Sequence, residues 1–96
     1  MAYRFIRLAS LKKALRNLKN PMAEKEINDF IDTKLDGCEN PRDRSLHYKP
    51  LKGTKLAGQC RYRIGDYRLI AIIDDTDVVI IGVETAHRKE IYRRRR

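Results

Sequence analysis

The sequence predicts an α+β fold in which a helical hairpin packs on a small antiparallel sheet, in the order β-α-α-β-β-β. Two observations carry this prediction: apolar residues recur at helical spacing between residues 11 and 35, and they alternate with a period of two from Leu51 onward. A chain of 96 residues is long enough for one modest core. We therefore assign residues 1–96 to a single domain and expect the arginines at 93–96 to form a frayed basic tail.

The first half of the chain predicts one short strand and two helices. Residues 2–8 alternate imperfectly and indicate a strand. Residues 10–19 are expected to form a helix capped by Ser10, with leucines on one face and basic residues on the other. Asn20-Pro21 begins a second helix, because asparagine is a good cap and proline suits the first helical turn.

The second half predicts a loop and then a meander of strands. Residues 38–50 show no period and contain two prolines, so we expect a loop with an exposed His47. The pattern then predicts strands at 59–64, 67–73 and 78–84, with Gly65-Asp66 as the first tight turn.

Counting outward from Gly65-Asp66 sets the expected register of the first hairpin. Arg63 then faces Arg68, and Arg61 lies on the same side of the sheet. The other side carries the apolar residues Tyr62, Ile64, Tyr67 and Leu69, which we expect to face the core. Like charges that face each other destabilise a hairpin, whereas guanidinium groups that converge can hold a phosphate. Long arginine side chains that splay into water are the structural alternative.

The overall charge points to a polyanionic or acidic partner. The chain carries 22 Lys+Arg against 13 Asp+Glu, a formal net charge of +9. No apolar run indicates a leader or a membrane span, so we expect a cytoplasmic protein. Cys38 and Cys60 are expected to be reduced thiols, and the spacing of cysteine and histidine fits no metal site. We expect no cofactor.

Three short motifs resemble the RelE/ParE toxin superfamily of bacterial type II toxin–antitoxin systems. They are "KPLKG" at 49–53, "LAGQCRYRIGDYRLI" at 56–70 and "HRKEIYR" at 87–93, in this order after a helical hairpin. The chain departs from many members at Ala86, where glycine is common, and at Ala71, where an aromatic residue is common. It also has arginines where strongly active members often have lysines, so these residues would stabilise charge and not accept a proton.

The resemblance implies a set of site residues. The expected catalytic residues are Arg61, Arg63, Arg68, His87 and Tyr92, and the expected RNA-binding residues are Lys49, Lys52, Arg88 and Arg93. The role of general base would then move to His87 or Tyr92. From the residues alone, an exposed histidine near a basic terminus is the simpler interpretation of His87.

The function implied by the RelE-like branch is a ribosome-dependent endoribonuclease that cuts messenger RNA in the ribosomal A site. The ribose 2′-OH attacks the adjacent phosphate. One alternative is a ParE-like toxin that inhibits DNA gyrase and cuts nothing. Another is a non-catalytic RNA-binding module, which would need Tyr62 and Tyr67 exposed for stacking. Under either toxin hypothesis, we expect a monomeric toxin bound by an acidic or amphipathic antitoxin that folds on its surface.

Overall fold

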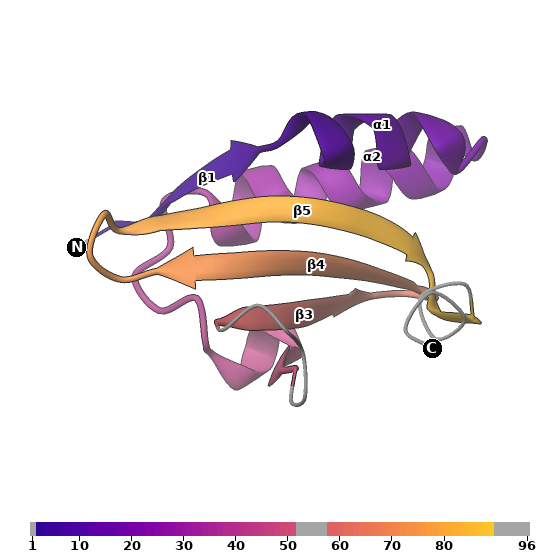
Figure 1. The fold of residues 1–96 in the computed structure, drawn as a ribbon. Helices are drawn as coiled ribbons and strands as arrows, with labels where there is room; N and C mark the ends of the chain where they lie inside the picture. The colour runs from indigo at the N-terminus through magenta and orange to yellow at the C-terminus, as the bar shows by residue number, and fades with distance from the viewer. Residues whose placement is uncertain (1, 52–57, 90–96) are drawn as a thin grey trace.

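The computed structural model describes residues 2–51 and 58–89, and it confirms the α+β fold class (Figure 1). Two helices lie side by side over a twisted sheet. The elements in chain order are β1 (Arg4–Arg7), α1 (Ala9–Asn17), α2 (Pro21–Phe30), a π-helical turn η1 (Ile31–Leu35), a 3₁₀ turn η2 (Arg44–Leu46), β2 (Tyr48–Pro50), β3 (Gln59–Ile64), β4 (Tyr67–Asp74) and β5 (Val79–His87).

The sheet has five strands in the order β1-β5-β4-β3-β2. Strands β3, β4 and β5 pair antiparallel, as predicted, and β2 adds an antiparallel partner to β3. β1 pairs parallel with β5, so the sheet is mixed. β2 lies inside the segment 38–50, which the sequence predicted to be a loop. Three residues ending in Pro50 are too few to show a period, and proline is tolerated there because β2 is an edge strand.

The two predicted helix starts have different outcomes. Asn20 caps α2 as predicted, because its side-chain oxygen accepts a hydrogen bond from the Ala23 N–H at 3.2 Å, and Pro21 begins the helix. The prediction that Ser10 caps the first helix is wrong. That helix begins at Ala9 with Leu8 as its cap, and the Ser10 hydroxyl donates to the Val83 carbonyl at 2.6 Å.

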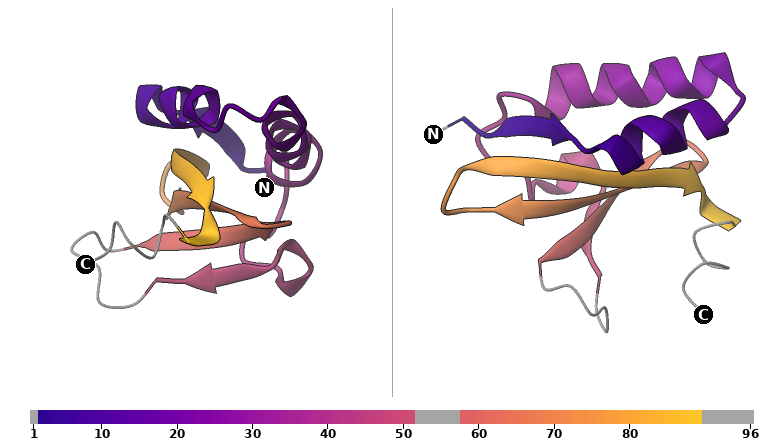
Figure 2. Two further views of the ribbon diagram at one scale, coloured as in Figure 1. Left: turned by 90° about the vertical axis from the view of Figure 1, so that its right-hand side faces the viewer. Right: turned by 45° about the horizontal axis from the view of Figure 1, so that its top comes forward.

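The core lies between the helices and one face of the sheet. α1 packs on β5 and β1, and α2 approaches β3 (Figure 2). The expected contact is confirmed: Leu15, Ile27 and Ile31 are buried in one cluster with Tyr62, Ile64, Leu69 and Ile80, while Leu18 and Phe30 pack at its edge. Tyr62 is central to this core. Its ring lies 6.2 Å from Phe30 and 6.0 Å from Tyr48 between centroids, and its hydroxyl donates to the Pro41 carbonyl at 2.6 Å.

Within the described residues, no helix is both long and apolar enough to cross a membrane.

Candidate nucleic-acid interface

The hairpin of β3 and β4 has the predicted register. Arg63 pairs with Arg68, Tyr62 with Leu69 and Arg61 with Ile70. Gly65 adopts a φ of +59° in the turn, a backbone conformation that favours glycine. Tyr62, Ile64 and Leu69 are therefore buried against the helices, and the arginines lie on the opposite face of the sheet, which we call the open face.

Four basic residues occupy neighbouring positions on the open face, and we call this set the arginine face: Lys49, Arg61, Arg63 and Arg68. Lys49 pairs with Arg61 across β2 and β3, just as Arg63 pairs with Arg68 across β3 and β4. Two like-charged pairs are thus placed directly opposite each other, an arrangement that destabilises a sheet. Neighbouring strands are about 4.8 Å apart, so these side chains can converge on one phosphate group.

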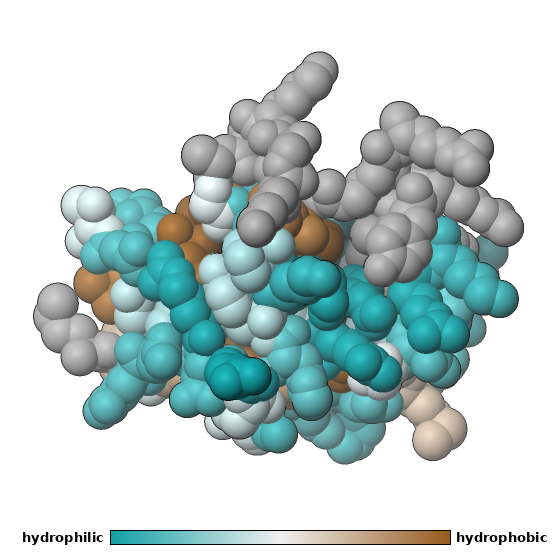
Figure 3. Space-filling model, turned by 90° about the horizontal axis from the view of Figure 1, so that it is seen from below, coloured by the Kyte–Doolittle hydropathy of each residue, from teal (hydrophilic) through white to brown (hydrophobic). Residues whose placement is uncertain are grey.

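Burial differs sharply within the arginine face. Lys49 and Arg63 are exposed and Arg61 is half-buried, whereas Arg68 is only 8% exposed. Arg68 lies on the inner strand β4, opposite Ala86, and donates to the Tyr67 carbonyl at 3.3 Å. Arg68 is therefore the most buried cation of this face. Figure 3 views the molecule from the side opposite the helices, where hydrophilic residues predominate and hydrophobic ones show between them.

His87 does not lie beside these arginines. It pairs with Tyr67, and its ring makes an edge contact with the Tyr67 ring at 5.5 Å between centroids. Because side chains alternate along a strand, Tyr67 and His87 lie on the helix side, whereas Arg68 and Ala86 lie on the open face. The backbone N–H of Lys89 donates to His87 Nδ1 at 3.3 Å.

The remaining predicted site residues have mixed outcomes. Arg88 is exposed beside the hairpin turn, where its backbone N–H donates to the Asp66 carbonyl at 3.0 Å. Lys52, Tyr92 and Arg93 lie outside the described residues.

Sequence reasoning missed the position of His47. The Arg63 N–H donates to the His47 carbonyl at 3.4 Å, so the backbone of this histidine adjoins the arginine face at the start of β2. His47 is exposed and has a φ of +55°, which is uncommon for a residue with a side chain. The alternation of His47 and Lys49 around Tyr48 was the signal that could have found it.

The burial of Tyr62 contradicts the hypothesis of a non-catalytic RNA-binding module. This residue is 0% exposed, and burial raises the pKa of its hydroxyl. Tyr67 is half-buried and packs at the edge of the core. Base stacking needs an exposed ring, so these tyrosines do not form a stacking surface.

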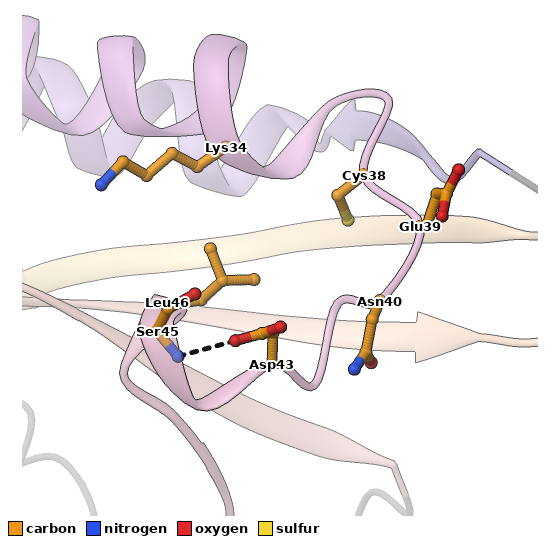
Figure 4. Close-up of a pocket in the computed structure, with 7 residues that line it drawn as sticks. All are labelled: Lys34, Cys38, Glu39, Asn40, Asp43, Ser45 and Leu46. Atoms are coloured by element: carbon orange, nitrogen blue, oxygen red, sulfur yellow. Dashed lines mark hydrogen bonds between the residues drawn. The ribbon is translucent and has the colours of Figure 1, made fainter.

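A polar hollow of about 330 Å³ lies between η1 and η2 (Figure 4). Its lining includes Lys34, Glu39 and Asp43 but no residue of the arginine face. The Asp43 carboxylate accepts a hydrogen bond from the Ser45 N–H at 2.8 Å, and this bond lowers the pKa of Asp43. The hollow is therefore separate from the candidate interface.

Both cysteines are free thiols, as predicted. Burial raises the pKa of Cys60 to about 11, which disfavours the thiolate form that acts as a nucleophile. Among the described residues, no cluster of histidine, cysteine or acidic side chains could hold a metal ion.

A family model described as the ParE toxin of the type II toxin–antitoxin system parDE matches residues 7–92. The chain belongs to this toxin family. This match confirms the RelE/ParE resemblance drawn from the three motifs, and the chain is a toxin of a type II toxin–antitoxin system. A search of curated proteins finds no match.

The chain is similar in structure to chains of several solved toxin–antitoxin complexes. A chain of the RelBE2 toxin–antitoxin complex of Mycobacterium tuberculosis is 25% identical with a TM-score of 0.73, and the match covers 91% of this chain and 99% of that one. A chain of the archaeal RelE–RelB complex of Pyrococcus horikoshii is 28% identical with a TM-score of 0.59, and coverage is 92% and 97%. A chain of the E. coli DinJ–YafQ complex shares the fold. It is 14% identical with a TM-score of 0.72, and the match covers 96% of this chain and 99% of that one.

Proposed function

We propose that this ParE-family toxin is a messenger-RNA endoribonuclease that acts on the ribosome. The observation that supports this proposal is the arginine face, where Lys49 faces Arg61 and Arg63 faces Arg68. These pairs destabilise the free sheet, and a bound phosphate would relieve that repulsion. The substrate would be the messenger RNA in the ribosomal A site.

In the proposed reaction, the ribose 2′-OH loses its proton and attacks the adjacent phosphate. The P–O5′ bond breaks, a 2′,3′-cyclic phosphate forms, and the leaving O5′ takes up a proton to become a 5′-hydroxyl. Negative charge grows on the non-bridging oxygens as the attack proceeds. Arg61, Arg63 and the buried Arg68 would stabilise that charge without any proton transfer. Arginine stays protonated, so a different group must take the 2′-OH proton.

Two histidines are candidates for that proton transfer. His87 was predicted from the family motif, but its ring contacts Tyr67 on the helix side of the sheet. His47 adjoins Arg63 at the start of β2. Tyr92 remains a prediction from the motif.

The test is primer extension on messenger RNA from translating ribosomes, with wild type beside Arg68→Ala, Arg63→Ala and the control Lys25→Ala. Lys25 is exposed on α2, away from the arginine face. Loss of one transition-state donor typically slows a reaction by about a hundredfold to a thousandfold. We expect that loss for the arginine variants and wild-type cleavage for Lys25→Ala. Parallel His47→Ala and His87→Ala variants identify the histidine that matters.

The second candidate function is a ParE-like toxin that inhibits DNA gyrase, and the match to the ParE family model favours it. Under this hypothesis wild type would halt growth without cutting RNA, and Arg68→Ala would be equally toxic. Inhibition of purified gyrase in a supercoiling assay would then confirm the alternative.

An antitoxin partner is part of the proposal under both functions. The similar structures include complexes with RelB and DinJ antitoxins. The net charge of +9 suits an acidic or amphipathic antitoxin segment that holds one toxin molecule.

A further inference from the structure

We infer that Glu84 is a catalytic residue whose carboxylate takes the proton of the attacking 2′-OH. The inference rests on the proposed function, since it assigns a residue to one step of that reaction. The observation behind it is an irregularity in β5 that places Glu84 on the same face of the sheet as the arginines.

β5 contains a β-bulge at Val83. Ala71 of β4 pairs with Gly82, whereas the preceding residue Ile70 pairs with Glu84, so Val83 is an extra residue in β5. Side chains alternate between the two faces of a regular strand, and one extra residue reverses that alternation. The bulge therefore changes the face on which the later residues of β5 lie.

This reversal moves Glu84 from the helix side of the sheet to the open face. A Cβ added at Gly82 would meet the side chains of Phe5 and Leu11, so Gly82 faces the helices. Regular alternation would give Glu84 the same side. Because of the bulge, Glu84 instead shares the open face with its partner Ile70, which belongs to a small apolar cluster outside the main core.

Two side-chain hydrogen bonds hold the chain on either side of Glu84. The start of α1 lies over β5 (Figure 1), and the Ser10 hydroxyl donates to the Val83 carbonyl at 2.6 Å. After the bulge, the Thr85 hydroxyl donates to the Arg68 carbonyl at 2.8 Å, and Thr85 is buried. These bonds stabilise the shifted register, so the position of Glu84 is built into the fold.

Glu84 extends the arginine face onto a fourth strand. One row of paired residues crosses β2, β3, β4 and β5 in the order Lys49, Arg61, Ile70 and Glu84. Arg68 pairs with Ala86, two residues after Glu84, so Arg68 and the half-buried Glu84 are diagonal neighbours on the open face. Diagonal neighbours are about 7–8 Å apart, which is within reach of long side chains.

A carboxylate at this position does not help to bind a phosphate. An ionised carboxylate only accepts hydrogen bonds, and it repels phosphate oxygens. A face that served only to hold RNA would therefore gain nothing from Glu84. The proposed reaction does need a proton acceptor, and the arginines cannot supply one because they stay protonated. Glu84 provides that acceptor beside them.

The two histidines are placed less favourably for this step. The His87 ring contacts Tyr67 on the helix side of the sheet, and His47 approaches Arg63 through its backbone carbonyl. The pairing of Glu84, in contrast, sets its side chain on the face that carries the arginines. The geometry therefore favours Glu84 as the general base.

In the inferred step, a carboxylate oxygen of Glu84 takes the proton of the 2′-OH while O2′ forms its bond to phosphorus. The P–O5′ bond breaks, its electron pair stays on O5′, and O5′ takes a proton from water. The protonated Glu84 then gives its proton back to the solvent.

The test is single-turnover cleavage of messenger RNA on translating ribosomes, followed by primer extension over a range of toxin concentrations. Glu84→Gln keeps the size of the side chain but cannot accept the proton. The control Glu39→Gln removes the same charge from an exposed residue of the polar hollow. We expect Glu84→Gln to lower the maximum rate by about a hundredfold to ten-thousandfold, the usual effect of losing a general base. The toxin concentration that gives half the maximum rate should stay unchanged, and Glu39→Gln should cut like wild type.

Chemical rescue separates proton transfer from a structural role. Glu84→Ala leaves space for a small carboxylate, so added formate should restore part of its cleavage rate. Formate should not accelerate Arg68→Ala, because that variant lacks a cation and not a base. Thermal unfolding by circular dichroism checks that each variant is folded.

Cleavage by Glu84→Gln at the wild-type rate would overturn the inference. A slow Glu84→Ala variant that formate does not accelerate would also overturn it, since Glu84 would then support the structure and not the proton transfer. Failure of the proposed function is distinguishable, because wild type itself would then cut no RNA. Failure of this inference alone leaves wild-type cleavage, and its loss in Arg68→Ala, intact.

Discussion

At the scale of single residues, burial separates side chains that the sequence pattern treats alike. Arg63 and Arg68 face each other, yet Arg63 is exposed and Arg68 is only 8% exposed. β4 is flanked by strands on both sides, with Ala86 leaving room for the long side chain, whereas β3 is next to the short edge strand β2. Alternation predicts the face on which a residue lies, and the neighbouring strands decide how deeply it is buried.

We expect that a single methyl group added at Gly82 destabilises the fold. A Cβ added there would lie 2.5 Å from Phe5 Cζ and 2.6 Å from Leu11 Cδ2, closer than real contacts allow. Gly82→Ala should therefore lower the free energy of unfolding by about 1–3 kcal/mol, the usual range for overpacking a core. Urea denaturation followed by circular dichroism measures this change.

A second variant shows whether the predicted contact is the cause. Phe5→Leu removes the atoms nearest to the added methyl group, so Gly82→Ala should destabilise the Phe5→Leu background less than the wild type. If the two changes were simply additive, the steric explanation would be wrong.

At the scale of elements, the join between the two helices depends on Asn20. Its side-chain oxygen accepts from the Ala23 N–H at 3.2 Å, and its amide donates to the Tyr67 hydroxyl at 3.3 Å. The same residue thus starts α2 and ties the helical hairpin to β4.

We expect Asn20→Ala to lower the free energy of unfolding by about 0.5–2 kcal/mol, the typical effect of losing a helix cap. Asn20→Asp should restore most of that loss, because its carboxylate can accept from both the Ala23 N–H and the Tyr67 hydroxyl. The urea midpoints of the three proteins are the measurement. An aspartate variant as unstable as the alanine variant would rule out capping as the cause.

At the scale of the whole molecule, Asp75 joins three distant segments. Arg42 donates to its two carboxylate oxygens at 3.1 and 2.9 Å, and the Tyr3 hydroxyl donates to Oδ1 at 2.7 Å. The N-terminus, the loop before η2 and the turn between β4 and β5 meet at this carboxylate. The hydrogen bonds from Arg42 and then Tyr3 lower the pKa of Asp75.

This contact predicts a pH dependence of stability. A carboxylate with a lowered pKa in the folded state contributes fully above its unfolded pKa of about 3.9, and the contribution is lost as the pH falls through the lower folded value. Asp75→Asn should therefore have a lower Tm than wild type at pH 7, and the difference should shrink below about pH 4. Thermal unfolding by circular dichroism across this range measures it.

Asp77→Asn is the matched control. It lies in the same turn, and within the described residues its carboxylate accepts no hydrogen bond, whereas its backbone N–H donates to Asp74. Its Tm should stay close to that of wild type at every pH. A Tm difference for Asp75→Asn that did not change with pH would contradict the assignment.

The helices, the strands β3 to β5 and the register that makes Arg63 face Arg68 were predictable from the sequence. Each depends on residues close together in the chain: a period of 3.6 or two, a cap at Asn20, or a turn at Gly65 from which pairs are counted. The bounds of two elements differ from the prediction. α2 gives way to η1 after Phe30, and Val78 adopts a φ of +56° in the turn instead of starting β5.

The contacts between distant residues depended on tertiary packing. It paired β1 parallel with β5, made a strand of Tyr48–Pro50, placed His87 on the helix side with Tyr67, and set His47 beside Arg63. These contacts join segments with no local signal linking them, because pairing at the sheet edges and burial of a side chain depend on how all elements pack at once. The basic residues proposed for the site could be read from the sequence, but the backbone contact between Arg63 and His47 could not.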